Sequence, residues 1–290
     1  MQDQIDAVRE NIFPGAHGAI ADWSRFPWHR DRSNRIDSHQ PHSSQALAID
    51  VFGTVAAHAA RDAVMAALAS DLVIPGAGPW SIEFEWTDPD HLLGEPRPTQ
   101  VDVMATGPAS AIVFECKFTE PGGGCSQPSP LRSGANRGVR QCNGAYEMQT
   151  NAVNGIAARC ALSAKGIRYW DHIPTIFGLD PALDHRPCPF AGEAFQWMRN
   201  TLLADRLGKS RKLATRVVAA FADGPGFPTA RKAKIGQLGL PVIQADAAIT
   251  PLSYQSIAAK AHAVSGDPLF EELSGWIERK VAAALSLRGG

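Results

Sequence analysis

The hydrophobic pattern of the chain opens with a helical stretch. From Gln45 to about Ala69, apolar residues recur at the spacing of one helix face, at positions 47, 51, 55, 59 and 64. Ser43-Ser44 precedes this stretch and offers the side-chain oxygen that caps a helix N-terminus. Pro75, Gly76, Gly78 and Pro79 then break the pattern. We therefore predict one long helix over residues 45–69.

Three segments of alternating polarity follow this helix. They are Ser81–Trp86, Thr99–Ala105 and Ala111–Phe118, and each has the period of two that is typical of a strand. In the first segment, Ile82, Phe84 and Trp86 are expected on one face, opposite Glu83 and Glu85. Gly107-Pro108 between the other two segments favours a turn, so these two are predicted to form a hairpin.

The remaining pattern predicts further helices and one more strand. Helices are expected at Gly134–Val153, Ala191–Ala204, Ser253–Val264 and Pro268–Leu285, and a buried strand is expected at Arg216–Ala222. The order of helix, three strands, helix and strand is that of a mixed α/β protein. Residues 1–42 are polar and weakly patterned, and are interpreted as an N-terminal arm before a single domain over residues 43–290, with an insertion at about 155–212.

Composition narrows the function only slightly. The 290 residues are 44% hydrophobic, which is enough for a sizeable core, and 28 Lys and Arg nearly balance 29 Asp and Glu. This balance disfavours a non-specific nucleic-acid coat protein, which is normally basic. We expect no signal peptide and no membrane partner, and with five cysteines and no CxxC pair, a reducing, cytoplasmic location.

An Asp on one predicted strand and Glu-x-Lys on the next are the main chemical signal. Because side chains alternate along a strand, Glu115 and Lys117 share a face. Asp102 lies on that face only if the hairpin loop has an even number of residues, and a loop of Gly107–Ser110 would place it opposite Glu115. Two carboxylates suit Mg²⁺, and a neighbouring lysine can orient water or stabilise developing negative charge. The alternative is that these charges only decorate a solvated strand face.

Several segments resemble a known family. The main run is RPTQVDVMATGPASAIVFECKFTE, with SSQALAIDVFG and EFEW…LLGE before it and RQCNGAY, CALSAKGIRYWD and CPFAGEAFQWMRN after it. Together they resemble bacterial restriction endonucleases of the PD-(D/E)XK superfamily over roughly residues 43–200. The resemblance implies a restriction-endonuclease-like core (helix, three-stranded meander, helix, strand), here with a cysteine-containing insertion and C-terminal helices. It also implies Asp102 and Glu115 as ligands of Mg²⁺ or Mn²⁺ and Lys117 as the catalytic lysine.

The sequence departs from that family in the acid that many members carry on the first helix. The stretch 45–69 contains no glutamate, and Val101 replaces the proline of the motif name. Glu85 and Glu95 are the two candidates for the missing acidic position. Gln141, on the helix expected after the hairpin, is a further candidate site residue.

Four cysteines and the choice of substrate leave alternatives open. Cys125, Cys142, Cys160 and Cys188 are scattered over a loop, the helix expected at 134–153 and two irregular segments. They either bind Zn²⁺ or an iron–sulfur cluster or remain free thiols. The first functional hypothesis is a metal-dependent endonuclease that cuts DNA in restriction or genome defence, as a homodimer if both strands are cut. The alternatives are a repair or recombination nuclease, and an inactive nuclease fold that binds DNA or a partner.

Overall fold

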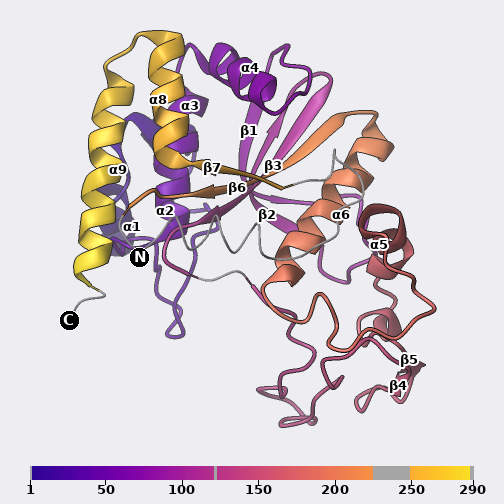
Figure 1. Ribbon diagram of the computed structural model, residues 1–290. Helices are drawn as coiled ribbons and strands as arrows, with labels where there is room; N and C mark the ends of the chain where they lie inside the picture. Colours follow the sequence, from indigo (N-terminus) through magenta and orange to yellow (C-terminus); the bar gives the residue numbers. More distant parts are fainter. Residues whose placement is uncertain (1, 121–122, 225–248, 288–290) are drawn as a thin grey trace.

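The protein is a mixed α/β structure built on one five-stranded sheet (Figure 1). The computed structural model describes residues 2–120, 123–224 and 249–287. The strands lie in the order β1-β2-β3-β6-β7. Their bounds are β1 Ser81–Thr87, β2 Gln100–Thr106, β3 Ser110–Lys117, β6 Ala214–Phe221 and β7 Ile249–Ser253. The first three strands and β6 confirm the strands predicted from alternation, whereas β7 was not expected.

The direction of the strands changes across the sheet. β1, β2 and β3 form an antiparallel meander, while β6 runs parallel to β3 and β7 runs parallel to β6. Parallel neighbours require a crossover, and helix α6, Ala194–Arg211, lies between β3 and β6 in the chain and packs on both. Pro251 lies on β7, at the sheet edge, where its missing N–H is tolerated.

Helices cover both faces of the sheet (Figure 1). On one face lie α2 Ser44–Ala48, α4 Arg61–Asp71, α8 Tyr254–Ser265 and α9 Leu269–Ser286; on the other lie α5 Tyr169–Phe177 and α6. The first face packs around Phe52 and Phe114, whose ring centroids lie 4.4 Å apart. Helices α8 and α9 confirm the two predicted C-terminal helices. No helix in the described parts of the chain is both long and apolar enough to cross a membrane.

The predicted helix over residues 45–69 is divided. It consists of α2, a π-helical turn η2 Ile49–Gly53, α3 Thr54–Ala57 and then α4. His58 causes the break, because its backbone is extended and its Nδ1 accepts a hydrogen bond from the Ala60 N–H at 3.0 Å. The expected cap is present, since the Ser43 hydroxyl accepts from the Ala46 N–H.

The expected single apolar face of β1 is wrong at its last residue. Phe84 packs with the core on the α8 and α9 side, whereas Trp86 packs with the core on the α6 side. Glu85 between them has φ = 50°, a left-handed conformation that non-glycine residues rarely adopt. This reversal turns the strand over, so two side chains that alternation places together lie on opposite faces.

The helix predicted at Gly134–Val153 is also wrong. These residues form turns and loops that lead into a two-stranded ribbon of β4, Gln149–Thr150, and β5, Ala157–Ala158. Gly134, Gly138 and Gly144 have φ between 79° and 87°, which a right-handed helix excludes. The helix that follows the meander and leads to β6 is α6, which corresponds to the helix expected at 191–204. The domain boundaries themselves stay a prediction.

The N-terminal segment is more regular than expected. It contains α1, Gln2–Glu10, and a 3₁₀ helix η1, Pro14–Ala19, and it buries Val8, Ile12 and Trp28 against Ala46 and Ile49. A buried ion pair then ties it to the C-terminal helix. Asp50 Oδ1 accepts from the Phe13 N–H at 2.7 Å, and Lys280 Nζ lies 2.6 Å from Asp50 Oδ2.

Candidate active site

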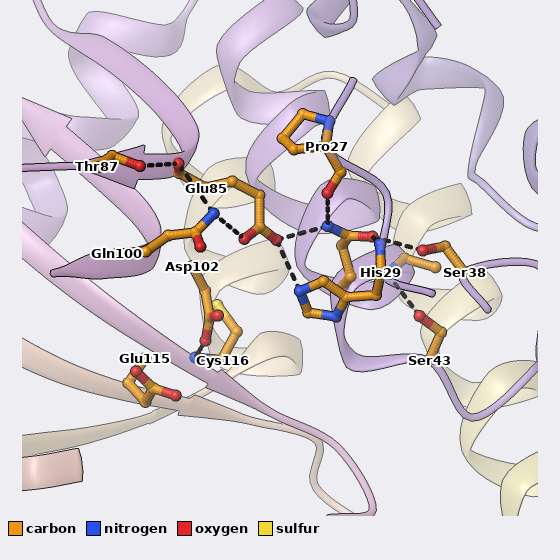
Figure 2. Close-up of polar contacts among 12 residues, drawn as sticks. Pro27, His29, Ser38, Ser43, Glu85, Thr87, Gln100, Asp102, Glu115 and Cys116 are labelled. Atoms are coloured by element: carbon orange, nitrogen blue, oxygen red, sulfur yellow. Dashed lines mark hydrogen bonds and ion pairs between the residues drawn. The ribbon is translucent and has the colours of Figure 1, made fainter. Parts of the chain in front are cut away.

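Three acids lie in a row across three adjacent strands. The β2–β3 pairing runs from Thr106–Ala111 to Val103–Phe114, which leaves a four-residue loop. Asp102 and Glu115 are the residues next to the end of this pairing on the two strands. The pairs Phe84–Val103 and Trp86–Val101 set Glu85 opposite Asp102. The loop therefore has the even length on which the predicted site depends. We call Glu85, Asp102 and Glu115 the acid row (Figure 2).

Asp102 occupies the middle of the acid row. Its Oδ2 accepts a hydrogen bond from the Cys116 N–H at 2.7 Å. Burial raises the pKa of Asp102 well above its usual range, the Glu115 carboxylate raises it further, and Lys117 opposes both. An acid in this position is stabilised by a cation that neutralises the local negative charge.

Glu115 is almost fully buried and is held by three side-chain donors. Lys117 Nζ and Gln196 Nε2 both donate to Oε1, and Asn200 Nδ2 donates to Oε2 at 2.6 Å. Gln196 and Asn200 are four residues apart on α6, so they lie on one helix face above β3. This helix fixes the orientation of Glu115 from the α6 side of the sheet.

Lys117 is the cation of the site. It lies two residues after Glu115 on β3 and forms an ion pair with it. Burial alone would lower the pKa of Lys117, but the charges of Glu115, Asp102 and Glu120 outweigh burial and raise the pKa above its usual value. The ammonium group therefore stays charged over the whole working range of pH.

Glu85 is held between the N-terminal segment and β2 (Figure 2). Its Oε1 accepts from Gln45 Nε2 at 2.6 Å and lies 3.2 Å from His29 Nε2, and its Oε2 accepts from Gln100 Nε2 at 2.9 Å. The hydrogen bond to Glu85 raises the pKa of His29 despite partial burial. Of the two candidates for the further acid, Glu85 is the one that the fold places beside Asp102.

Glu95 and Gln141 lie elsewhere. The Glu95 carboxylate accepts from the hydroxyls of Thr99 and Tyr169. Gln141 is buried in the loop region after β3, and its N–H donates to the Gln127 carbonyl at 3.1 Å. Its expected place on a helix beside the site is taken by Gln196, which sequence reasoning missed. The signal for this pair was available in the sequence. Gln196 and Asn200 are four residues apart on the helix predicted at 191–204, so they share a helix face.

The four scattered cysteines come together, away from the acid row. Cys125, Cys142, Cys160 and Cys188 line a single cavity in the segment between β3 and α6. Cys116 is separate, since it lies on β3 and packs into the core on the α8 and α9 side, the face opposite Glu115.

The donor chemistry of the acid row suits a hard divalent ion, because carboxylate oxygens are what Mg²⁺ prefers. Within the described ranges, no group of three or more His, Cys, Asp or Glu side chains is arranged so that it could hold a metal ion as it stands. A pair of carboxylates whose remaining positions are filled by water is the arrangement that these residues fit.

A mixed sheet flanked by helices on both faces places the protein among mixed α/β proteins. Comparison with family models then identifies the family. The model described as Restriction Endonuclease associating with ARP matches residues 16–227, and the chain belongs to this family of restriction endonucleases. The comparisons with curated proteins and with solved structures give no match.

Proposed function

We propose that this chain is a PD-(D/E)XK nuclease that hydrolyses phosphodiester bonds of DNA with Mg²⁺ or Mn²⁺. One observation carries the proposal: Asp102 and Glu115 lie next to the end pair of the β2–β3 ladder, Val103–Phe114, and the charges of Glu115 and Lys117 both act on Asp102. Membership of a restriction endonuclease family supports the same reaction class.

Asp102 and Glu115 would hold the metal ion in this proposal. When bound, the ion would polarise a phosphate oxygen and lower the pKa of an attacking water molecule. Gln196 and Asn200 keep the Glu115 carboxylate aimed along the strand face through their hydrogen bonds. Such outer partners hold a ligand in one orientation, and their loss commonly costs about 10–100-fold in metal affinity or activity.

Lys117 is assigned to the reacting phosphate and water. A charged ammonium group beside two carboxylates can hold the water in line with the phosphorus atom and offset the negative charge that grows on the phosphate oxygens. Its charge does not depend on pH in the working range, because the neighbouring carboxylates raise its pKa. Lys117 is therefore proposed to position and stabilise, and not to act as a general base.

Glu85 is proposed to take the place of the acid that the first helix lacks. That helix presents Gln45 to the site, and the Gln45 amide donates to Glu85. In the family that the sequence resembles, the first helix carries this acid. Here β1 carries the acid, and the helix only orients it through Gln45. The left-handed backbone at Glu85 is the local strain through which β1 directs this side chain.

Glu85→Gln and Glu95→Gln form a matched pair that tests this assignment. We expect Glu85→Gln to reduce the rate of DNA cleavage by about 10–100-fold, because it removes a negative charge beside Asp102. Glu95→Gln should stay within about threefold of the wild-type rate, since its contacts are with Thr99 and Tyr169. The measurement is the DNA cleavage rate of both variants at saturating Mg²⁺. A larger loss of rate in Glu95→Gln than in Glu85→Gln would contradict the assignment of Glu85 to the site.

Asp102→Asn is expected to stabilise the protein when no divalent ion is present. The folded-state pKa of Asp102 is raised, so the folded protein loses stability from this group as pH rises from about 4 through that raised pKa. The asparagine variant escapes this loss, and its melting temperature should exceed that of the wild type increasingly as pH rises. Each kcal/mol corresponds to about 2–4 °C.

Adding Mg²⁺ should reverse the order of the two melting temperatures. Only the wild type then gains stability from binding the ion. Asp71→Asn, on the surface where Asp71 pairs with Lys260, serves as the control and should show neither effect. An Asp102→Asn variant less stable than the wild type at every pH without metal would contradict the electrostatic account.

DNA is the proposed substrate, and three exposed arginines are proposed to contact its backbone. Arg132, Arg137 and Arg140 lie in the segment after β3, and phosphate contacts supply sequence-independent affinity. A second concentration of basic residues runs from Arg199 to Lys234. In it Arg211 already pairs with Asp90, and Arg231, Lys232 and Lys234 lie outside the described residues. We further propose that the chain acts in restriction and does so as a homodimer. The association with ARP that the family description names is part of the same proposal.

The proposed function is tested by a cleavage assay with supercoiled DNA, linear DNA and RNA. The wild-type chain should cut DNA in Mg²⁺ or Mn²⁺ and lose activity in EDTA. Cutting of ends alone would favour a repair or recombination nuclease, and tight DNA binding without cleavage in any divalent ion would favour an inactive binding module. The decisive variant in this assay, Lys117→Met, is treated in the Discussion.

A further inference from the structure

The segment between β3 and α6 has little regular structure to hold it together. Apart from α5 it contains the two-residue strands β4 and β5 and a three-residue 3₁₀ helix η3, Ser163–Lys165. Four large apolar side chains on it are exposed: Met148, Val153, Ile156 and Leu183. Between residues 123 and 160 the buried side chains are Gln127, Gln141, Tyr146 and Asn151, so this part has little apolar core of its own. Segments that bury little apolar surface are commonly stabilised by a disulfide or a structural metal.

Four cysteines from separate parts of this segment line one small cavity. Cys125 follows β3, Cys142 lies before β4, Cys160 follows β5, and Cys188 lies before α6. The cavity has a volume of about 30 Å³, and about 10–15 Å³ is enough for one water molecule. This space is large enough for a single ion.

Backbone hydrogen bonds hold the cysteine loops against one another. The Gln141 N–H donates to the Gln127 carbonyl at 3.1 Å, which joins the loop of Cys125 to that of Cys142. The Cys188 N–H donates to the Gly144 carbonyl at 2.9 Å, and the Cys125 N–H donates to the Ala191 carbonyl at 3.2 Å. The main chain therefore brings the loops of Cys125, Cys142 and Cys188 together.

The surroundings of the sulfurs keep them protonated as long as no cation is present. Burial raises the pKa of Cys125 to about 12 and that of Cys188 to about 11, and the neighbouring cysteines add to both shifts. Burial also raises the pKa of Cys142. In each of the three, the backbone N–H two residues later, at Gln127, Gly144 or Phe190, opposes the rise by hydrogen bonding to the sulfur.

This repeated arrangement is what a metal–thiolate site uses. N–H donors to the sulfurs orient a thiolate and spread its charge. Gly144, two residues after Cys142, has φ = 87°, a conformation that lets the chain turn around the sulfur. Lys165 is a positive group close to the sulfurs. Burial lowers the pKa of Lys165, and the charges of Cys125, Cys142 and Cys160 raise it in part.

We propose that Cys125, Cys142, Cys160 and Cys188 form a four-thiolate site for one thiophilic divalent ion, which we expect to be Zn²⁺. All four are free thiols in the structure, so no disulfide competes for them. As the side chains stand, no trio of ligand-type residues in the described part of the chain could hold an ion. Binding therefore requires the sulfurs to turn toward the cavity about their χ1 bonds and to release their protons.

The site is independent of the proposed nuclease centre and can be tested without activity. The wild-type chain, purified without chelators or a metal-affinity step, is analysed for zinc and iron. We expect one zinc per chain, unchanged in Asp102→Asn and in Cys116→Ser, which keep the four cysteines. Cys160→Ser and Cys142→Ser should each lose most of the zinc and melt at a lower temperature.

Cobalt spectroscopy of the wild-type chain avoids any dependence on variants that fail to fold. After zinc is removed with chelator and replaced by Co²⁺, the protein should show sulfur-to-cobalt charge transfer and the visible bands of a tetrahedral ion. Absence of both zinc and the cobalt spectrum would overturn the proposal. Iron with acid-labile sulfide, or four cysteines oxidised in pairs, would overturn it in favour of a cluster or of disulfides.

Discussion

Lys117→Met is expected to reduce the cleavage rate by about 10²–10³-fold at saturating DNA and Mg²⁺, with little change in DNA affinity. Removal of one preorganised group that stabilises transition-state charge has an effect of this size. Methionine keeps the apolar stem of the side chain, so the change isolates the ammonium group. DNA affinity is measured with Ca²⁺ in place of Mg²⁺, so that binding and cleavage are separated.

The buried Glu115 complicates this substitution and requires two controls. Glu115 loses its cationic partner but keeps Gln196 and Asn200 as donors, so a melting curve must show that the variant is folded. Lys260→Met removes a surface lysine that pairs with Asp71 at 2.7 Å, and its cleavage rate should stay within about twofold of the wild type. Wild-type cleavage by Lys117→Met, or cleavage that persists in EDTA, would refute the assigned site.

Lys280→Met is expected to lower the free energy of unfolding by about 3–5 kcal/mol, the cost of leaving one partner of a buried ion pair alone. Asp50 is fully buried, and its Oδ2 accepts from Trp276 Nε1 at 3.0 Å as well as pairing with Lys280. Burial raises the pKa of Asp50, and the Lys280 charge holds that rise back. Without Lys280 the acid must take up a proton or remain buried as an unpaired charge.

The pH dependence identifies the mechanism of this loss. A protonated Asp50 tolerates burial, so the loss in Lys280→Met should be smaller at low pH and grow as pH rises. Arg279→Met is the control, because Arg279 is an exposed neighbour that lies 5.6 Å from the Trp276 ring. In urea unfolding, this variant should lose about 0.5–1 kcal/mol of the free energy of unfolding at most.

A double variant completes the comparison. Asp50→Leu with Lys280→Met replaces both charges by apolar groups and should recover much of the stability lost in the single variant. A loss below about 1 kcal/mol in Lys280→Met would show that this pair does not join the N-terminal segment to α9 as we infer.

The sequence by itself determined three strands, the hairpin between the second and the third, and the candidate residues on that hairpin. Strand alternation and turn chemistry act over neighbouring residues, so Ile112, Phe114 and Cys116 could be assigned to one face and Glu115 and Lys117 to the other. The same local reasoning predicted β6 and the two C-terminal helices. It also limited the choice of hairpin loop to even lengths if the site was to form.

Tertiary contacts decided what local patterns could not. Glu85 is preferred over Glu95 only because the pairing of β1 with β2 sets it opposite Asp102. Gln196 is preferred over Gln141 because glycines with positive φ prevent a helix in the segment that starts at Gly134. The helix that packs over β3 starts instead at Ala194 and carries Gln196. Register and crossover depend on residues far apart in the chain, and periodicity within one segment carries no information about them.

The four cysteines show the same division most clearly. From the sequence they are isolated residues with no metal-ligand spacing, since the shortest interval, Cys125 to Cys142, spans a whole loop. Main-chain hydrogen bonds join the loops of Cys125, Cys142 and Cys188, and Cys160 lines the same cavity. Residue types determined which chemistry was available to this protein, and the packing of distant segments decided where that chemistry is assembled.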